Sequence, residues 1–188
     1  LNTVAISLIT SILIVLIAFL INFSKNYFNS DPLKKLSQLA ILGYSMPGAI
    51  IAIGILKLNS SINGFIPLML IGSISGLIFS YVVRFLAVAW QPIESSMEKL
   101  GASANKASRT LNVKPIKSLI NVHYSVLKKP LLISCLIVFI DITKELPLTL
   151  ILRPFNFDTL ATLTYDLISQ AQFFQSSIPS LLIILISI

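Results

Sequence analysis

The chain has 188 residues, of which 55% are hydrophobic and 11% are charged, with a formal net charge of +7. A soluble domain carries roughly a quarter charged residues, so this composition and a mean hydropathy of +0.90 exclude an ordinary soluble domain. The apolar residues come in blocks, and about 20 apolar residues form a helix that crosses a bilayer. The sequence therefore predicts an all-α, polytopic membrane protein.

The apolar blocks predict about five membrane spans. In chain order they are Val4–Ser24, Gln38–Leu56, Ile66–Ala89, Leu131–Leu152 and a last one that starts at Ile178 and is cut short. The connecting segments are Lys25–Ser37, the turn-rich Lys57–Phe65, the long polar stretch 90–130 and the mixed segment Arg153–Gln175. We therefore expect one incomplete transmembrane domain over residues 1–188, with no cleavable signal peptide.

Basic residues are distributed unevenly between the two sides of the predicted membrane. The Lys25–Ser37 loop, the 90–130 stretch and the adjacent Arg84 hold eleven of the fourteen Lys and Arg residues. Alternating spans place these segments on one side, and Lys and Arg collect on the cytoplasmic side of membrane proteins. The opposite side keeps only Lys57 and Arg153. This asymmetry accounts for the positive charge through orientation and contact with anionic lipid, so nucleic-acid binding is not needed to explain it.

Several features inside the predicted spans are candidates for a function or for close packing. Pro47 removes a backbone donor within the second span and predicts a kink or local unwinding there. Gly72 and Gly76 form a GxxxG pattern, and Gly48 and Ala52 form the looser small-xxx-small pattern of packed membrane helices. The fourth span contains three ionisable side chains, Asp141, Lys144 and Glu145. They are expected either to line a translocation path or to form a structural cluster that pairs with Arg84 or Arg153.

The 90–130 stretch has the periodicity of two amphipathic helices at the membrane surface. Apolar residues recur at steps of three and four from Ile93 through Met97, Leu100, Ala104 and Ala107 to Leu111. Pro92 stands at a favoured helix start. A second stripe begins at Ile116, includes His123, and is expected to end at Pro130. Periodicity alone is equally compatible with a docking element for a soluble partner and with helices that lie in the headgroups.

Three segments resemble the corresponding parts of ferric-iron ABC importer permeases, in the same order along the chain. They are GYSMPGAIIAIGIL (Gly43–Leu56), YVVRFLAVAWQPIESSMEKLGAS (Tyr81–Ser103) and KELPLTLILRPFNFDTLATLTYDLISQ (Lys144–Gln170). Residues from Lys106 to Ser125 are similar in spacing to the family's "EAA…G…I-x-L-P" loop. Permeases of this type usually carry two homologous halves, and this chain resembles the C-terminal half.

The resemblance implies a type I ABC-importer permease bundle in a bacterial inner membrane, with 90–130 as its cytoplasmic coupling loop. That loop would dock a separate ATP-binding subunit through Met97, Leu100, Gly101, Ala104, Lys106, Ala107, Ser108, Asn112, Tyr124 and Ser125. It further implies a second permease half and a solute-binding protein that delivers substrate near Arg153–Gln175. The expected translocation path includes Pro47, Asp141, Lys144 and Glu145.

The chain departs from the family pattern at three places in the loop. Lys106 stands where the family has Glu, Asn112 stands where it has Gly, and Tyr124-Ser125 stands where it has Leu-Pro. Asn tolerates the left-handed backbone that a Gly turn needs, whereas Lys106 inverts a charge. Two alternatives therefore stay open: a permease of the same superfamily for thiamine, a polyamine or an oxyanion, and a degenerate membrane subunit without ATPase coupling.

The sequence supplies little material for catalysis. Gly101–Ser108 lacks the second glycine of a phosphate-binding loop and lies in a helical pattern, so ATP is expected on the partner chain. His123 is the only histidine and Cys135 the only cysteine; we expect both to have packing roles. We therefore expect a transporter subunit rather than an enzyme, without a cofactor or a dedicated metal site of its own.

Overall fold

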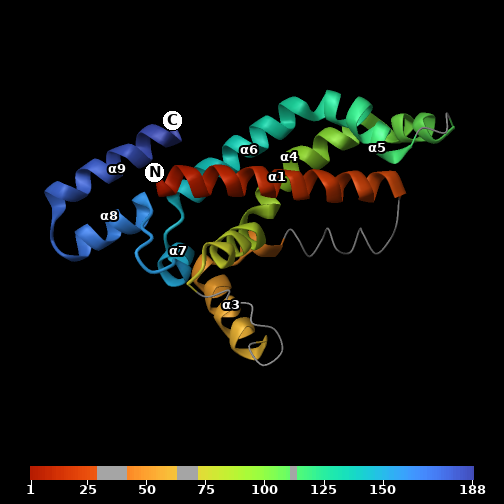
Figure 1. The fold of residues 1–188 in the computed structure, drawn as a ribbon. Helices are drawn as coiled ribbons and strands as arrows, with labels where there is room; N and C mark the ends of the chain where they lie inside the picture. Colours follow the sequence, from red (N-terminus) through yellow and green to blue (C-terminus); the bar gives the residue numbers. More distant parts are fainter. Residues whose placement is uncertain (29–41, 63–71, 111–113) are drawn as a thin grey trace.

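The computed structural model describes residues 1–28, 42–62, 72–110 and 114–188, and these ranges contain helices and no strand. Figure 1 shows how the elements are arranged. In chain order they are α1 (Asn2–Phe28), α3 (Gly48–Ile62), α4 (Ile74–Thr110), α5 (Pro115–Ser118), the π-helical segment η1 (Leu119–Tyr124), α6 (Ser125–Lys144), α7 (Pro147–Leu152), α8 (Leu160–Ser169) and α9 (Phe173–Ser187).

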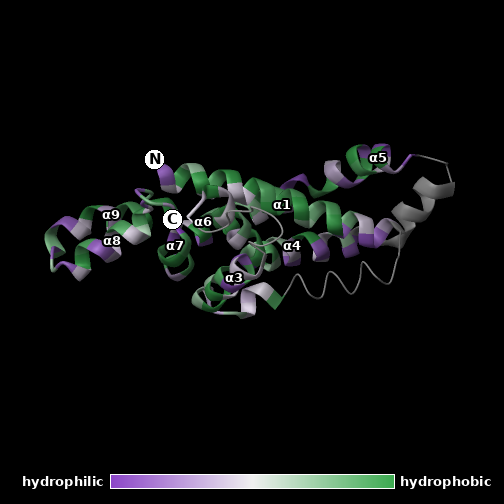
Figure 2. Cartoon of the chain, turned by 60° about the horizontal axis from the view of Figure 1, so that its bottom comes forward, coloured by the Kyte–Doolittle hydropathy of each residue, from purple (hydrophilic) through white to green (hydrophobic). Residues whose placement is uncertain are grey.

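The core lies where α1, α4 and α6 pack against one another. Fully buried apolar side chains come from all three helices, and they include Ile14, Leu77, Trp90, Ile93 and Val138. Two stretches of the described helices, Asn2–Tyr27 and Ile74–Lys99, are long and apolar enough to cross a bilayer. Figure 2 shows that hydrophobic residues predominate along α1, and large apolar side chains of these helices, such as Ile9, Ile12 and Phe79, are exposed. Such a surface is suited to the hydrocarbon core of a bilayer, because the exposure of apolar area to water is unfavourable.

Helix α1 links two opposite ends of the molecule. Its 27 residues extend over about 40 Å. Near its start, the amide of Asn2 donates to the carbonyl of Asp158 (3.5 Å). Near its end, Lys25 pairs with Glu94 of α4, and its ammonium lies 5.8 Å from the centre of the Trp90 ring. The beginning of α8 and the polar part of α4 therefore lie at opposite ends of the bundle.

Two prolines that were expected at helix ends lie inside helices. Pro92 lies within α4, which continues from Ile74 to Thr110, so the first amphipathic helix is an extension of the third span and not a separate surface helix. Pro130 lies within α6. A proline removes one backbone hydrogen bond, but membrane helices tolerate it where neighbouring groups compensate. Beside Pro92, the hydroxyl of Ser96 donates to the Pro92 carbonyl at 2.7 Å.

Other expected boundaries were wrong. Helix α3 runs on to Ile62, so most of the expected connector after Leu56 is helical, whereas the start of the second span and residues 63–71 lie outside the described residues. Gly72 precedes α4 with φ of 64° and is exposed, so Gly72 and Gly76 do not form a motif on one helix. The fourth span is divided into α6 and α7, and α9 begins at Phe173 rather than at Ile178.

The helix expected over the first apolar block is confirmed, and so is the buried face of α4 at Ile93 and Met97, the two stripe residues whose side chains the structure describes. Ile93 and Met97 are buried at 0% and 5% exposure, and Glu98 on the opposite face is exposed. The second stripe is only partly buried: His123 is 3% exposed and packs edge-on against Phe23, with ring centres 4.8 Å apart. Ile116 in α5 and Ile120 in the π-helical segment η1 are exposed.

Candidate functional site: an interhelical cavity and the two ends of the bundle

The second predicted span is interrupted at Met46 and Pro47. Residues 42–45 are helical, Met46 and Pro47 are not, and α3 begins at Gly48. The expected local unwinding at Pro47 is therefore confirmed. Proline cannot donate a backbone hydrogen bond, and the carbonyls before it are freed from the helix. The Met46 carbonyl accepts instead from Arg84 Nη1 of α4 at 3.3 Å.

A second interruption lies between α6 and α7. Glu145 takes an extended conformation (ψ of 115°) directly after α6, and Pro147 is at the start of α7. Glu145 Oε1 accepts a hydrogen bond from the backbone N–H of Leu148 at 3.1 Å. A carboxylate at a helix start is stabilised by unpaired N–H groups and by the helix dipole. Glu145 thus determines where α7 begins.

An ion pair joins these two interruptions to α4. Arg84 Nε lies 3.1 Å from Glu145 Oε2, and the two side chains are 18% and 6% exposed. Among the described residues Nε has no hydrogen-bond partner, so the attraction at this nitrogen is ionic and not directional. A Cβ on Gly48 would lie 2.5 Å from both Arg84 Nη1 and Glu145 Oε1. Gly48 therefore leaves the space in which the two charges meet.

The four residues of the expected path surround one cavity. Pro47, Asp141, Lys144 and Glu145 line an open cavity of about 440 Å³, together with Tyr44, Ser45, Met46, Arg84 and Phe85. Within the described part of the chain, Asp141 and Lys144 do not form the ion pair that their spacing allowed. Both side chains line the cavity. The wall thus carries two cationic and two anionic groups.

A second cavity continues from the first along α4 and α6. It has about 450 Å³ and shares Tyr44, Ser45 and Asp141 with the first cavity, and its remaining lining residues are Ala87, Val88, Gln91, Pro92 and Ile137. From Arg84 to Pro92 the helix rises about 12 Å. The shared lining makes the two cavities neighbours, and the second lies further along α4 toward the end of the bundle at Lys25 and Glu94.

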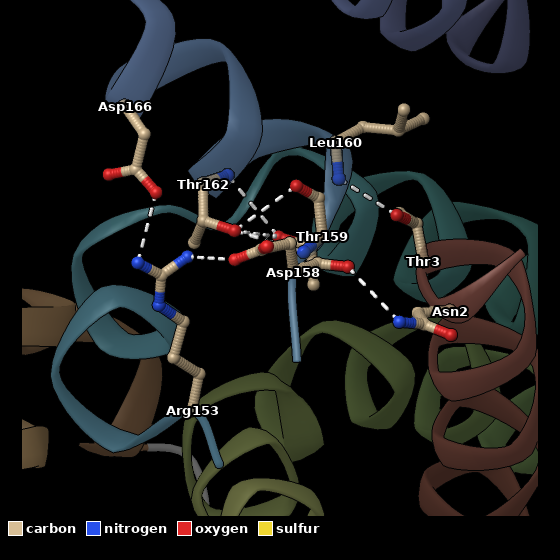
Figure 3. Close-up of polar contacts among 8 residues, drawn as sticks. All are labelled: Asn2, Thr3, Arg153, Asp158, Thr159, Leu160, Thr162 and Asp166. Carbon is tan, nitrogen blue, oxygen red and sulfur yellow. Dashed lines mark hydrogen bonds and ion pairs between the residues drawn. The ribbon is translucent and has the colours of Figure 1, made fainter. Parts of the chain in front are cut away.

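At the opposite end, Arg153 fixes the connection between α7 and α8 (Figure 3). Its guanidinium pairs with Asp158, and its Nη2 lies 3.0 Å from Asp166 Oδ2. Thr159 and Thr162 form a reciprocal capping box at the start of α8. The same α8 start is attached to α1, because the backbone N–H of Leu160 donates to the Thr3 hydroxyl at 2.8 Å.

Large aromatic side chains project from this end of the bundle. Phe155 in the α7–α8 connection is 100% exposed, and Phe173 and Phe174 at the start of α9 are 67% and 90% exposed. All three lie within the Arg153–Gln175 segment, where a solute-binding protein was expected to dock. The fixed α7–α8 connection and its exposed aromatic side chain are suited to a binding surface, because aromatic anchors contribute strongly to protein interfaces.

The expected coupling-loop residues are described only in part. Residues 100–110 continue α4 as helix, and Asn112 lies outside the described residues. Met97 is buried and accepts from the amide of Asn26 at 3.5 Å, so it holds α1 against α4. Tyr124 is 53% exposed and Ser125 is also exposed. These two are accessible to a partner at the junction of η1 and α6.

A dedicated metal centre is not found in the described part of the chain. No group of three or more His, Cys, Asp or Glu side chains lies together there. Asp141 and Glu145 supply hard oxygen atoms of the kind that ferric iron accepts, but the nearby Arg84 and Lys144 offset their charge. The cavity therefore holds two carboxylates and two cations, with no net charge among these four groups.

Comparison with known proteins adds no family assignment. No protein-family model matches the chain, and no curated protein is significantly similar to it.

Sequence reasoning missed the two residues that organise the cavity. Arg84 was considered only as a structural partner of the acidic groups, yet it contacts both helix interruptions. Gly48 was considered for helix packing alone. The sequence held one signal for each: a charge within an apolar span, which usually faces protein or water, and a glycine directly after an intramembrane proline.

Proposed function

We propose that the chain is a multi-pass membrane subunit of a binding-protein-dependent ABC importer, in a bacterial inner membrane. The observation that carries this proposal is the recess between α4, α6 and the segment before α3, where two helix interruptions and four charged groups meet. Irregular backbone at membrane depth is tolerated only inside protein or beside a water-filled cavity. Discontinuous helices at the bilayer midplane are the usual setting for transporter sites.

The proposed path begins at the exposed aromatic end and passes the Arg84–Glu145 pair. Asp141 belongs to both cavities, so a solute that moves between them passes its carboxylate. Lys144 and Arg84 hold the opposite charge on the same wall. Arg84 lies on α4 and Glu145 lies between α6 and α7, so movement of α7 relative to α4 would change their separation.

ATP hydrolysis is assigned to a separate cytoplasmic subunit. The polar end of α4 extends beyond the apolar stretch that ends at Lys99, and α5 follows it at the same end. In the proposed importer these helices receive the mechanical input, and a second permease half completes the path. Lys106 and Asn112 favour the alternative of an uncoupled subunit, because each replaces a residue that the family uses to support docking.

Ferric iron is the solute we propose, on the strength of the sequence resemblance. The carboxylates of Asp141 and Glu145 supply suitable oxygen atoms. High affinity for iron would reside in the solute-binding protein. A permease of the same superfamily for thiamine, a polyamine or an oxyanion would share this fold and this docking mode. Uptake of each labelled solute distinguishes these candidates.

Co-purification from detergent tests the proposed coupling. The full-length protein should retain an ATPase subunit, and reversal of charge at Lys114 and Lys117 should reduce the amount recovered. Lys57→Glu is the matched control, because it reverses an exposed charge on α3. Loss of the ATPase subunit in the loop variants alone supports the assignment. Equal recovery in all variants, or no ATPase subunit with the native chain, would reject it.

A further inference from the structure

A third cavity lies on the outer surface of the bundle, away from the charged recess. It is a groove of about 470 Å³ between α1 and the η1–α6 segment, lined by Ile12, Val15, Leu16, Phe19, Leu119, Ile120, Tyr124, Leu131 and Cys135. Its wall is almost wholly apolar. Ile12, Leu16, Ile120 and Tyr124 are each more than half exposed. The groove therefore opens to the surroundings of the bundle and is not a closed internal void.

One lysine lies on the stripe that forms this groove. Tyr124, Leu131 and Cys135 line it, and Lys128 stands four residues after Tyr124 and three before Leu131. Residues three and four apart share one face of a helix. Lys128 is exposed, and its flexible stem lets the ammonium reach the polar side of a membrane boundary while its methylenes cover apolar surface.

The segment that forms the η1–α6 side of the groove carries only positive charge. No Asp or Glu occurs in the sequence between Lys99 and Asp141, a stretch with six Lys and Arg residues, including Lys114, Lys117, Lys128 and Lys129. Those four lysines are exposed. A partner in the groove therefore needs an apolar part that contacts the groove wall and a negatively charged part that contacts these lysines. An anionic phospholipid has both properties, with its acyl chains joined to a phosphate.

We propose that the groove holds an acyl chain of an anionic phospholipid, with its phosphate at Lys128. The apolar wall accepts the chain, and Lys128, which lies on the same helix stripe between the lining residues Tyr124 and Leu131, supplies the positive charge for the phosphate. Attraction of one lysine to an anionic membrane surface is worth about 1 kcal/mol. This inference rests on the proposed insertion of the chain in a membrane, but not on ATPase coupling or on the identity of the solute.

Cys135 provides a direct probe, because it is the only cysteine of the sequence and lines the groove. We would measure its labelling rate with a membrane-permeant maleimide, using the full-length protein in nanodiscs of phosphatidylcholine alone or with added phosphatidylglycerol. The anionic lipid should slow labelling. Lys128→Gln should raise the phosphatidylglycerol content needed for half protection about fivefold, and Lys128→Arg should behave like the native chain.

Lys57→Gln is the control, since Lys57 is an exposed lysine on α3, remote from the groove lining. The proposal is overturned if both lipids give the same labelling rate, or if the control weakens protection as much as Lys128→Gln. Equal protection in both lipids would indicate a zwitterionic lipid or a protein segment in the groove. Because the assay needs no ATPase, protection without co-purification would reject the proposed coupling and leave this site intact.

Discussion

Replacing Gly48 by alanine tests the packing of the charged cluster most sharply. The added Cβ would lie 2.5 Å from Arg84 Nη1 and Glu145 Oε1, about 1 Å closer than ordinary contact, which begins near 3.4 Å. The two charged groups must then move apart. These atoms are the far ends of flexible side chains, so the cost comes from separating the two charges and lies in the lower part of the about 1–3 kcal/mol typical of overpacking; the better helix propensity of alanine offsets up to about 1 kcal/mol of it. We expect a net loss of stability.

Gly54→Ala is a matched control in the same helix. A Cβ at Gly54 would meet no described atom within 4 Å, so alanine should be neutral or stabilise α3 by up to about 1 kcal/mol. Far-UV circular dichroism in detergent would follow thermal unfolding of both variants. Taking about 2–4 °C per kcal/mol, their midpoints should differ by roughly 2–12 °C. Equal midpoints would refute the steric argument.

Three further predictions concern the ion pair, the core and the topology. Glu145→Ala should destabilise the chain by on the order of 3 kcal/mol, and exchange of the charges at Arg84 and Glu145 should recover part of it; no recovery would contradict a direct pair. Tyr81→Phe removes a hydrogen bond of 2.6 Å to a buried threonine hydroxyl and should cost about 1–3 kcal/mol in chemical unfolding, whereas an unchanged unfolding curve would argue against it. In a chain without the native cysteine, Lys117→Cys should react with an impermeant maleimide only in inside-out vesicles, and Lys57→Cys only in intact cells. The reverse labelling pattern would contradict the proposed topology.

Local sequence patterns were sufficient for the features that depend on nearby residues. The apolar block of α1, the buried face at Ile93 and Met97, and the unwinding at Pro47 all follow from short stretches of chain. The four candidate path residues also line one cavity. Each of these features is set by hydropathy, helical period or the missing donor of a proline.

Proline and glycine positions were the main source of wrong boundaries. Pro92 and Pro130 were expected to limit helices, a rule that reflects helices exposed to water. In an apolar surrounding an unpaired backbone group is costly, so the chain keeps the remaining helical bonds. Gly72 illustrates the opposite case, because its left-handed conformation ends the local regularity that a GxxxG motif requires.

Contacts between distant residues could not be derived from the sequence. Lys25 and Glu94 are 69 positions apart, and the Arg84–Glu145 pair depends on how α4 crosses the interruption between α6 and α7. The sequence named possible partners for the acidic groups without selecting one. The space left by Gly48 is a property of three segments together, so no pattern within one segment reveals it.

Uptake of labelled ferric iron tests the central claim most directly. Cells that carry the full-length protein with its ATPase subunit and solute-binding protein should accumulate iron, and an ATPase subunit unable to hydrolyse ATP should abolish accumulation. Asp141→Asn should reduce uptake while the protein remains in the membrane at its usual level. Iron accumulation that is unchanged without this chain, or that persists without ATP hydrolysis, would contradict the account.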